Sequence, residues 1–450
     1  MSCRSMRLSE LSLPARASAL RGALLVPVLL VACRTVDRGA GSARPEAERI
    51  RRDIAYLADD RLEGRATGTA GNDSAASWLA RRHEALGLRR IVGEQGSPCS
   101  GTRGVPCTFL QRFTARGAEL AHAGRPEGVP TQNVVAMVPG RDPALAGEYV
   151  VIGGHFDHLG RSPSNALDQG DAIRNGADDN ASGTAAVLEL ARLFAAHPAR
   201  RSIVLAHFSG EELGLLGSQW FVEHSPVPTG NMVAMLNFDM VGRLRNDRLI
   251  VYGVATAREL PALVDSANLE PKLQIRAVGD GFGPSDHSSF FAKGIPVLHF
   301  FTDLHEDYHR AGDDAEKVDA AGTARIVAVA ERVVRAIADR PARLTPVRVA
   351  AAPTVAPARG SNVYLGTIPD MAAGDAPGLR LTGVRAGSPA DKGGLAAADV
   401  IVRFAGREVK DLYSYSEALY AHKPGDEVEI VYLRGSERRT TRVTLGTRGQ

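Results

Sequence analysis

The stretch EYVVIGGHFD, residues 148–157, joins a buried strand to the first polar side chains of a site. Its centre is a continuous apolar run, as expected for a strand that is covered on both faces. The run ends at His155 and Asp157. In an open parallel sheet, functional groups collect at the carboxyl ends of the strands. The stretch therefore predicts a parallel sheet with a polar site at one edge.

Runs of the same kind continue along the chain and alternate with helical patterns. The strand-like runs are 201–210, 231–242, 247–253 and 294–301, and the helix-like runs are 181–197, 213–224, 257–269 and 320–339. Strands that alternate with helices at this spacing form layered α/β folds. We therefore predict a three-layer α/β sandwich with a largely parallel mixed sheet over residues 46–340.

Acidic and imidazole side chains gather at the strand ends and in the loops beside them. The motifs are GGHFDH with His155 and Asp157, GADDNASG with Asp178 and Asp179, GEELGLLGS with Glu211 and Glu212, NFDMVG with Asp239, and LHEDYH with His305, Tyr308 and His309. Because the carboxyl ends of parallel strands meet at one edge, we expect these motifs to meet there.

Adjacent acids such as Glu211 and Glu212 need a positive partner. Carboxylates held together in a dry cleft repel each other or raise one another's pKa. Imidazole and carboxylate without cysteine suit zinc with an open catalytic position. The residues are enough for two ions that share a bridging carboxylate. One glutamate can then be a ligand while its neighbour takes a proton from metal-bound water.

The five motifs, in this order, resemble the co-catalytic di-zinc aminopeptidase family, which includes secreted bacterial leucyl aminopeptidases, glutamate carboxypeptidases and glutaminyl cyclases. The resemblance covers about residues 46–340. It implies a zinc exopeptidase fold, two zinc ions and attack of a zinc-bound hydroxide on the scissile carbonyl. Many relatives insert a protease-associated domain before the first ligand strand, and the stretch 90–147 is too short for one.

The resemblance also implies roles for individual residues. Its zinc ligands fall on His155, Asp179, Glu212, Asp239 and His309. Asp179 is expected to bridge both ions. Glu211 is expected to act as the general base and later to protonate the leaving amine. Asp157 is expected to orient His155 through its other ring nitrogen, and Tyr308 to hold the oxyanion.

Other residues in these motifs have simpler expected roles. Asp178 is expected to cap the following helix or to stabilise its loop. His158 and His305 are expected to be solvated or to lie behind the ligands. The segment GPSDHSSF, residues 283–290, is similar to the family's pattern. Whether Asp286 and His287 act directly in the pocket stays open.

The first 32 residues predict a secretory signal peptide. Arginines precede the apolar run ALLVPVLLVA, which is too short to span a bilayer and ends at Cys33. LVAC, residues 30–33, resembles the bacterial lipobox, which implies a lipidated Cys33 on a tether over 33–45 and a lipid-anchored protein in the bacterial cell envelope. A plain signal peptide and secretion are the alternative. An oxidising envelope would permit a disulfide between Cys99 and Cys107.

The C-terminal part of the chain predicts a second domain. Residues 341–359 are rich in Pro and Ala, lack periodicity and predict a linker. Residues 360–447 resemble a PDZ domain, with VYLGTIPD as the carboxylate-binding loop and LYSYSEALYAH as the groove helix. Ala398 departs from the glycine usual before Asp399. The resemblance implies binding of an extended C-terminus by strand addition, or else an appendage whose groove is unused.

Charge and motifs together narrow the function. The net charge of +3 equals the charge of the first 32 residues, and a near-neutral remainder argues against a nucleic-acid binder. The sequence predicts an envelope-anchored zinc exopeptidase, an aminopeptidase acting on peptides, with an accessory PDZ domain. Glutaminyl cyclase and carboxypeptidase activity on the same scaffold stay open. A PDZ adaptor with an inactive peptidase-like domain is the rival from another class, and the intact ligand set argues against it.

Overall fold

The computed structural model describes most of the 450-residue chain. The described residues are 44–93, 98–99, 106–116, 120, 125–161, 172–279, 281, 283–347, 363–369, 377–385, 387–410 and 412–447. The predicted signal peptide, Cys33 and nearly all of the tether lie outside them, as does the predicted linker from residue 348 onward. Within the described ranges, no helix has the length and apolar character needed to cross a membrane.

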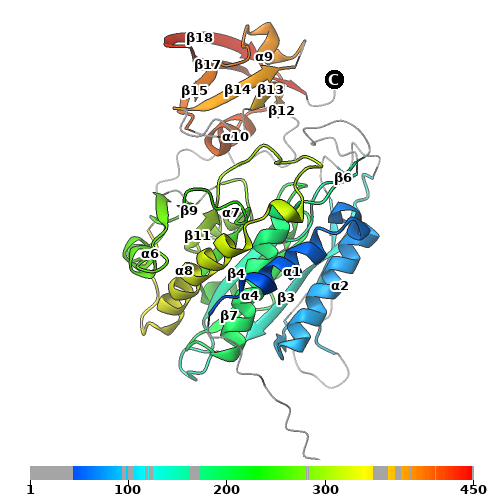
Figure 1. Cartoon of the computed structure of the whole chain (residues 1–450), viewed down its shortest axis with the longest axis vertical. Coiled ribbons are helices and arrows are strands. Elements are labelled where there is room, and N and C mark those ends of the chain that lie inside the picture. Colours follow the sequence, from blue (N-terminus) through cyan, green and yellow to red (C-terminus); the bar gives the residue numbers. More distant parts are fainter. Residues whose placement is uncertain are drawn as a thin grey trace, which may run out of the picture. The chain divides into compact units, whose positions relative to one another are not determined.

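A nine-stranded sheet lies at the centre of the larger domain (Figure 1). Its order is β1-β3-β7-β4-β8-β11-β9-β10, with β2 paired to β3. The central strands β7, β4, β8 and β11 are parallel, and antiparallel pairing adds β3 on one side and β9 on the other. The predicted largely parallel mixed sheet is confirmed. The strands are β1 Arg89–Arg90, β2 Leu110–Ala115, β3 Val129–Val138, β4 Tyr149–His155, β7 Ser202–Phe208, β8 Met232–Phe238, β9 Arg248–Tyr252, β10 Gln274–Val278 and β11 Val297–Phe301.

Helices cover both faces of this sheet, because its strands present apolar side chains alternately to each side. On β4, Val150 and Ile152 belong to the core that holds α1, α2, α4, α6 and α8, whereas Val151 belongs to a second core with α5 and α7. The predicted three-layer sandwich is therefore confirmed. The helices are α1 Ala47–Leu57, α2 Ala70–Ala85, α4 Gly183–Ala196, α5 Leu216–Glu223, α6 Leu260–Ala267, α7 His287–Phe291 and α8 Ala320–Asp339.

Short elements complete the larger domain. They are η1 Asp60–Arg65, β5 Gly160–Arg161, β6 Ile173–Arg174, η3 Ala177–Ser182, η4 Thr229–Asn231 and η5 Ala315–Lys317. Cys99 and Cys107 form a disulfide with their Cα atoms 5.6 Å apart.

Leu344 is buried in the core and Val347 donates a backbone hydrogen bond to Thr256. The start of the predicted linker, 341–347, thus packs against the domain instead of leaving it.

The C-terminal domain has a separate hydrophobic core and a six-stranded antiparallel sheet. The sheet order is β13-β14-β15-β17-β18, with β16 paired to β15. The predicted small β-rich domain is confirmed. Its elements are β12 Val363–Tyr364, β13 Thr367–Pro369, β14 Leu379–Val384, α9 Pro389–Lys392, β15 Val400–Phe404, β16 Arg407–Glu408, α10 Leu412–Tyr420, β17 Glu427–Arg434, β18 Glu437–Thr444 and β19 Gly446–Thr447.

Candidate metal centre

The polar motifs meet at one edge of the central sheet. His155 is the last residue of β4, Asp239 directly follows β8, and Glu211 comes three residues after the end of β7. Asp179 lies in η3, and His309 lies in the segment between β11 and α8. These side chains are nearly buried, with between 1% and 15% of their surface exposed. The chain therefore brings together the residues that its motifs single out.

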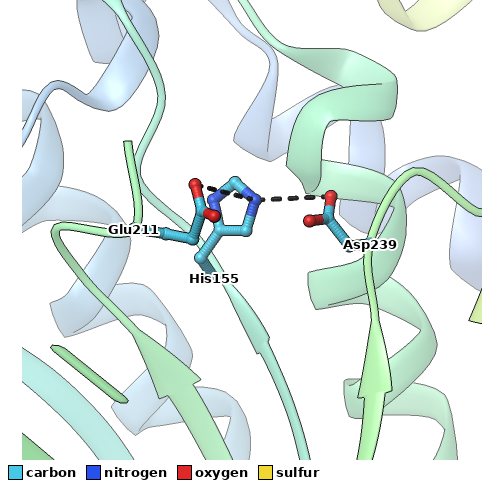
Figure 2. Close-up of side chains that lie close together, drawn as sticks. All are labelled: His155, Glu211 and Asp239. Carbon is cyan, nitrogen blue, oxygen red and sulfur yellow. Dashed lines mark ion pairs between the residues drawn. The ribbon is translucent and has the colours of Figure 1, made fainter. Parts of the chain in front are cut away.

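His155 is the centre of the first cluster (Figure 2). Its Nε2 lies 3.4 Å from Asp179 Oδ1 and 3.4 Å from Asp239 Oδ1. Glu211 Oε2 is farther away, at 3.9 Å. His155 Nδ1 faces the backbone oxygen of Asp157 at 3.1 Å. Because a carbonyl only accepts hydrogen bonds, Nδ1 carries the proton and leaves Nε2 free to bind a metal.

His309 is the centre of the second cluster. Its Nε2 lies 3.3 Å from Asp179 Oδ2 and 3.3 Å from Glu212 Oε2. Asp179 thus directs one oxygen to each histidine. This is the arrangement that a carboxylate bridging two ions requires.

The distances fit zinc in both clusters. Two donors bound to one tetrahedral zinc at its usual bond lengths lie about 3.3 Å apart. The four separations just given are 3.3 or 3.4 Å. His155 Nε2 and Asp239 Oδ1 are buried and have no hydrogen-bond partner among the described residues. Such orphaned atoms would be costly without a cation between them.

The charges around the histidines also favour cations. Burial alone would lower the pKa of His309, but the neighbouring Glu212 outweighs it and raises this pKa to about 10. At His155 burial acts in the same direction and is outweighed by Asp239 and Glu211, so its pKa rises well above the usual value. The negative charge at both positions attracts a positive ion.

The two adjacent glutamates differ in their environment. Burial raises the pKa of Glu211 well above its usual value, and Glu212 adds to the rise against an opposing effect of His155. Burial would also raise the pKa of Glu212, but His309 and His158 outweigh it and hold that pKa well below its usual range. Glu211 is therefore suited to carry a proton and Glu212 to remain a carboxylate.

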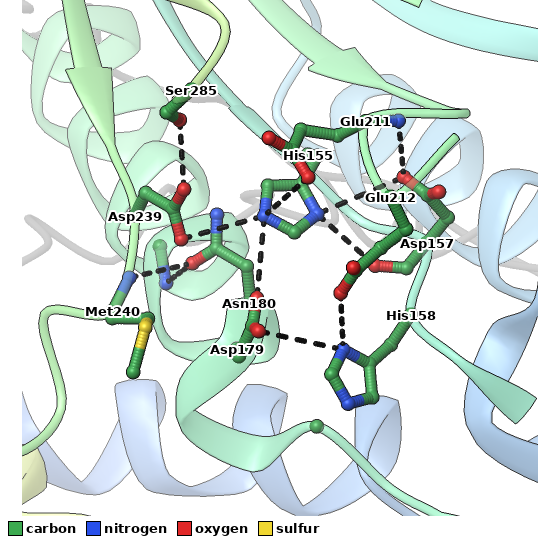
Figure 3. A network of polar contacts seen from close by, with 12 residues as sticks. His155, Asp157, His158, Asp179, Asn180, Glu211, Glu212, Asp239, Met240 and Ser285 are labelled. Carbon is green, nitrogen blue, oxygen red and sulfur yellow. Dashed lines mark hydrogen bonds and ion pairs between the residues drawn. The ribbon is translucent and has the colours of Figure 1, made fainter. Parts of the chain in front are cut away.

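Asp157 contacts both His155 and the backbone of Glu211 (Figure 3). Its carboxylate accepts hydrogen bonds from Thr67 Oγ1 at 2.8 Å and from the backbone N–H of Glu211 at 3.3 Å. The same carboxylate is 3.7 Å from His155 Nδ1, farther than the carbonyl of Asp157 itself. Asp157 thus orients His155 through its backbone more than through its side chain, a division that the sequence does not reveal.

Tyr308 lines the cleft above the clusters and stacks on His309, with ring centroids 3.9 Å apart. Burial, together with the charges of Asp179 and Glu212, raises the pKa of Tyr308 well above its usual value. The phenol therefore keeps its proton and remains a hydrogen-bond donor.

The residues with open or minor predicted roles lie around the clusters. Asp178 accepts hydrogen bonds from Ser182 Oγ and from the backbone N–H of Gly242, so it stabilises its loop. His305 Nε2 lies 3.2 Å from Asp178 Oδ2, behind the ligands. Asp286 and His287 are buried, and neither is among the residues that line the cleft.

Sequence reasoning missed two groups that hold candidate ligands. Ser285 Oγ donates to Asp239 Oδ2 at 2.7 Å. Asp313 Oδ2 accepts the backbone N–H groups of Asp178 and Asp179 at 2.9 and 3.0 Å, so it fixes the loop of the bridging residue. Ser285 lies in the GPSDHSSF segment and Asp313 in the loop that supplies His309. Their proximity in the sequence to these motifs is the signal that could have identified the two residues.

The chain is similar to known peptidases over much of its length. Residues 133–334 match the model "Peptidase family M28", and residues 362–445 match "PDZ domain". A stretch of 110 residues, 24% of this chain, is 44% identical to a probable zinc metalloprotease of Pyrenophora teres f. teres and covers 22% of that protein. Leupeptin-inactivating enzyme 1 of Streptomyces exfoliatus is 29% identical over 267 residues, 59% of this chain and 50% of that protein.

A solved structure shares the fold. A zinc aminopeptidase from Bacillus subtilis is 18% identical, with a TM-score of 0.50 over 68% of this chain and 99% of that chain. The chain spans less than two thirds of the length of the curated relatives named above. The family matches nevertheless fall on the two parts of the chain that have hydrophobic cores of their own. Residues 133–334 of this chain therefore form a domain of the peptidase family M28 type, and residues 362–445 form a PDZ domain.

Proposed function

We propose that this protein is a zinc-dependent exopeptidase, specifically an aminopeptidase that removes the first residue of a peptide. The match of residues 133–334 to family M28 supports a zinc peptidase. The two histidine-centred clusters around Asp179 support two zinc ions. The choice of the amino end rests on the cleft.

The described lining of the cleft contains no Lys or Arg side chain. Four carboxylates line it. The lining residues of the larger domain are Asp179, Glu211, Glu212, Asp239, Met240, Pro284, Leu304, Tyr308 and His309. A terminal carboxylate is usually held by Arg or Lys, and the described lining of the cleft offers neither. This observation favours the amino end of the substrate over the carboxyl end.

One wall of the cleft is apolar. Met240 belongs to a small hydrophobic cluster, and Leu304 and Tyr308 pack against that cluster. An apolar first side chain could bury its surface there at a gain of about 25 cal/mol per Å². We therefore expect substrates with an aliphatic N-terminal residue to be preferred over charged ones.

The reaction adds water to the scissile carbonyl and breaks the C–N bond. When bound, the zinc ions acidify water and polarise the carbonyl. Glu211 takes the proton from the attacking water and returns it to the leaving amine. Tyr308 donates a hydrogen bond to the oxygen that becomes negative. Asp157 holds both His155 and the backbone of Glu211, so the base stays beside the first cluster.

Matched substrates with zinc analysis test this function. We expect the full chain to release p-nitroaniline from leucine p-nitroanilide and to lose activity after chelation. The N-acetylated compound should be inert, because its ammonium group is blocked. Cleavage of a C-terminal residue from an N-blocked peptide would indicate a carboxypeptidase. Cyclisation of N-terminal glutamine with a single zinc would indicate a glutaminyl cyclase, and no turnover with intact zinc would favour the adaptor.

The PDZ domain adds a second proposed partner. Strand β13 pairs only with β14 and lies at the end of its sheet, so among the described strands its other edge is unpaired. An extended C-terminal peptide can add a strand at such an edge. We propose that this domain holds a protein C-terminus.

We also propose that the protein is anchored in a bacterial envelope through Cys33, with secretion as the alternative.

A further inference from the structure

His158 lies beside the second cluster, and neither the predicted ligand set nor the proposed mechanism uses it. It follows β4, and only 1% of it is exposed. Its ring packs on Gly176, which has a φ of +55°. A Cβ at residue 176 would come within 2.4 Å of His158 Cγ. The chain therefore leaves space for this ring with a glycine.

The ring nitrogen of His158 faces Glu212. His158 Nδ1 lies 2.8 Å from Glu212 Oε1, and both atoms are buried (Figure 3). The alignment falls short of an ideal hydrogen bond, and neither atom has another hydrogen-bond partner among the described residues. The other oxygen of Glu212 lies on the side of His309, 3.3 Å from Nε2. Glu212 thus divides its two oxygens between two histidines.

The distances separate a ligand from a group that holds a ligand. Donors on one tetrahedral zinc lie about 3.3 Å apart. His309 matches this value to both Asp179 and Glu212. His158 does not, because its Nδ1 is 2.8 Å from Glu212 and 3.8 Å from Asp179. A separation of 2.8 Å is instead the usual length of a charge-assisted N–H···O contact.

We propose that His158 is a positioning residue that holds Oε1 of Glu212, keeps Oε2 on the side of His309 and so sets the affinity of the second zinc site. The inference rests on the two-zinc centre of the proposed function. It assigns a role to a histidine that the sequence places only among solvated or supporting residues.

Ser285 provides a matched case at the first cluster. Its hydroxyl donates to Asp239 Oδ2, while Asp239 Oδ1 faces His155 at 3.4 Å. Each of these two carboxylates therefore has one oxygen held by a neighbour and one oxygen turned to its cluster. If the two holders act separately, removing each weakens a different ion.

Zinc affinity of the full chain tests the proposal. Zinc is titrated against a competing chelator for the parent, His158→Ala, His158→Asn and Ser285→Ala. We expect two tight ions in the parent and one in each alanine variant, with the other ion about 10–100-fold weaker, the usual effect of losing such a partner. His158→Asn should regain much of the affinity, because its amide N–H can replace Nδ1–H. The double alanine variant should hold no tight ion.

The outcomes distinguish the inference from the proposed function. Fewer than two tight ions in the parent would overturn the two-zinc centre and the inference with it. Two tight ions in both the parent and His158→Ala would overturn the inference alone. An asparagine variant as weak as alanine would make His158 a ligand, because an amide is a poor zinc ligand. If the alanine variant does not fold by circular dichroism, His158→Leu, which keeps the ring volume without a donor, takes its place.

Discussion

At the scale of single residues, the site works by giving each carboxylate oxygen one partner. Asp179 serves both clusters, Asp239 divides itself between His155 and Ser285, and Glu212 between two histidines. Glu211 is the exception, since its Oε2 lies 3.9 Å from His155 Nε2 and its pKa is raised chiefly by burial. The difference between the adjacent glutamates can be measured directly.

We predict opposite effects for the two glutamates. Glu211→Gln keeps the shape of the side chain and removes only the proton acceptor, so zinc content should stay near that of the parent while kcat falls about 10²–10⁴-fold. Glu212→Ala removes a carboxylate from the second cluster, so zinc per chain should fall. Zinc content and kcat are measured on the same samples. Loss of zinc from the glutamine variant with retention in the alanine variant would reverse the assignment.

The positions of the strand ends could predict the cluster residues, but not the residues that form hydrogen bonds to them. His155, Glu212 and Asp239 follow apolar runs, so their place at one edge follows from the parallel sheet. Ser285 and Asp313 contact residues that lie 46 and 134 positions away, and no local sequence pattern predicts such pairs. For the same reason the sequence could not place His158 beside Glu212, because its surroundings depend on Gly176 and Glu212, which are distant in the sequence.

At the scale of elements, α2 and β7 are joined by a buried pair of histidines. His83 Nε2 and His207 Nε2 lie 3.1 Å apart, and both residues are fully buried. Burial, with a smaller contribution from Arg82, lowers the pKa of His83 to about 3, and burial also lowers the pKa of His207 well below its usual value. Both rings are therefore neutral in the folded protein at neutral pH.

This pair should make the larger domain sensitive to acid. Above the unfolded pKa of about 6.5 both histidines are neutral in the folded and in the unfolded state, so the pair causes no change of stability with pH there. Below it the unfolded chain binds protons that both folded histidines exclude, His83 until near pH 3, so stability falls by about 1.4 kcal/mol per pH unit for each histidine. Urea unfolding at pH 7.0 and 5.5, followed by tryptophan fluorescence, measures the loss.

A glutamine variant provides the control for this prediction. His83→Gln retains a hydrogen-bonding amide and cannot titrate, so the difference in stability between the two pH values should shrink by about 1.4 kcal/mol. Both tryptophans of the chain, Trp78 and Trp220, lie in the larger domain and report its unfolding. An unchanged difference would show that His83 is accessible to protons in the folded state.

Elements with strong periodicity could be predicted, and segments held by single contacts could not. The apolar runs of β4, β7 and β8 predict strands because both faces of the sheet are covered. The segment 341–347 has no such pattern. It stays on the domain through the buried Leu344, an Arg343–Glu148 ion pair of 2.7 Å and hydrogen bonds from Thr345 to Glu259. None of these contacts can be inferred from composition.

At the scale of the whole molecule, the larger domain extends to Val347 and the PDZ domain has its own core. We predict that a chain ending at Val347 retains zinc and cleavage of leucine p-nitroanilide. A chain ending at residue 342 should be less stable by about 2–5 kcal/mol, the usual cost of removing one buried leucine side chain. Urea midpoints of the two truncations measure this. Inactivity of a folded 347 truncation would make the PDZ domain part of the catalytic unit.

The proposed anchor can be tested independently of the enzyme. Cys33→Ala should prevent lipidation in a bacterial host, because the thiol that carries the lipid is absent, so the protein should leave the membrane fraction or remain unprocessed. Cell fractionation and the mobility of the band on a gel measure this. The matched variant Cys3→Ala should behave like the parent. Identical fractionation and mobility of the parent and Cys33→Ala would leave secretion as the better proposal.

The proposed zinc ligands are spread along the chain, and this limits when the protein could acquire metal. They run from position 155 to position 309, and Asp313, which fixes the loop of the bridging residue, comes later still. A chain emerging from the ribosome cannot assemble the second cluster until nearly all of the larger domain has been synthesised, and the loop of Asp179, which both clusters share, is fixed only once Asp313 is in place. Zinc must then be supplied by the compartment where folding ends. If the chain is exported unfolded, enzyme yield depends on zinc outside the cytoplasm, however much the cytoplasm holds.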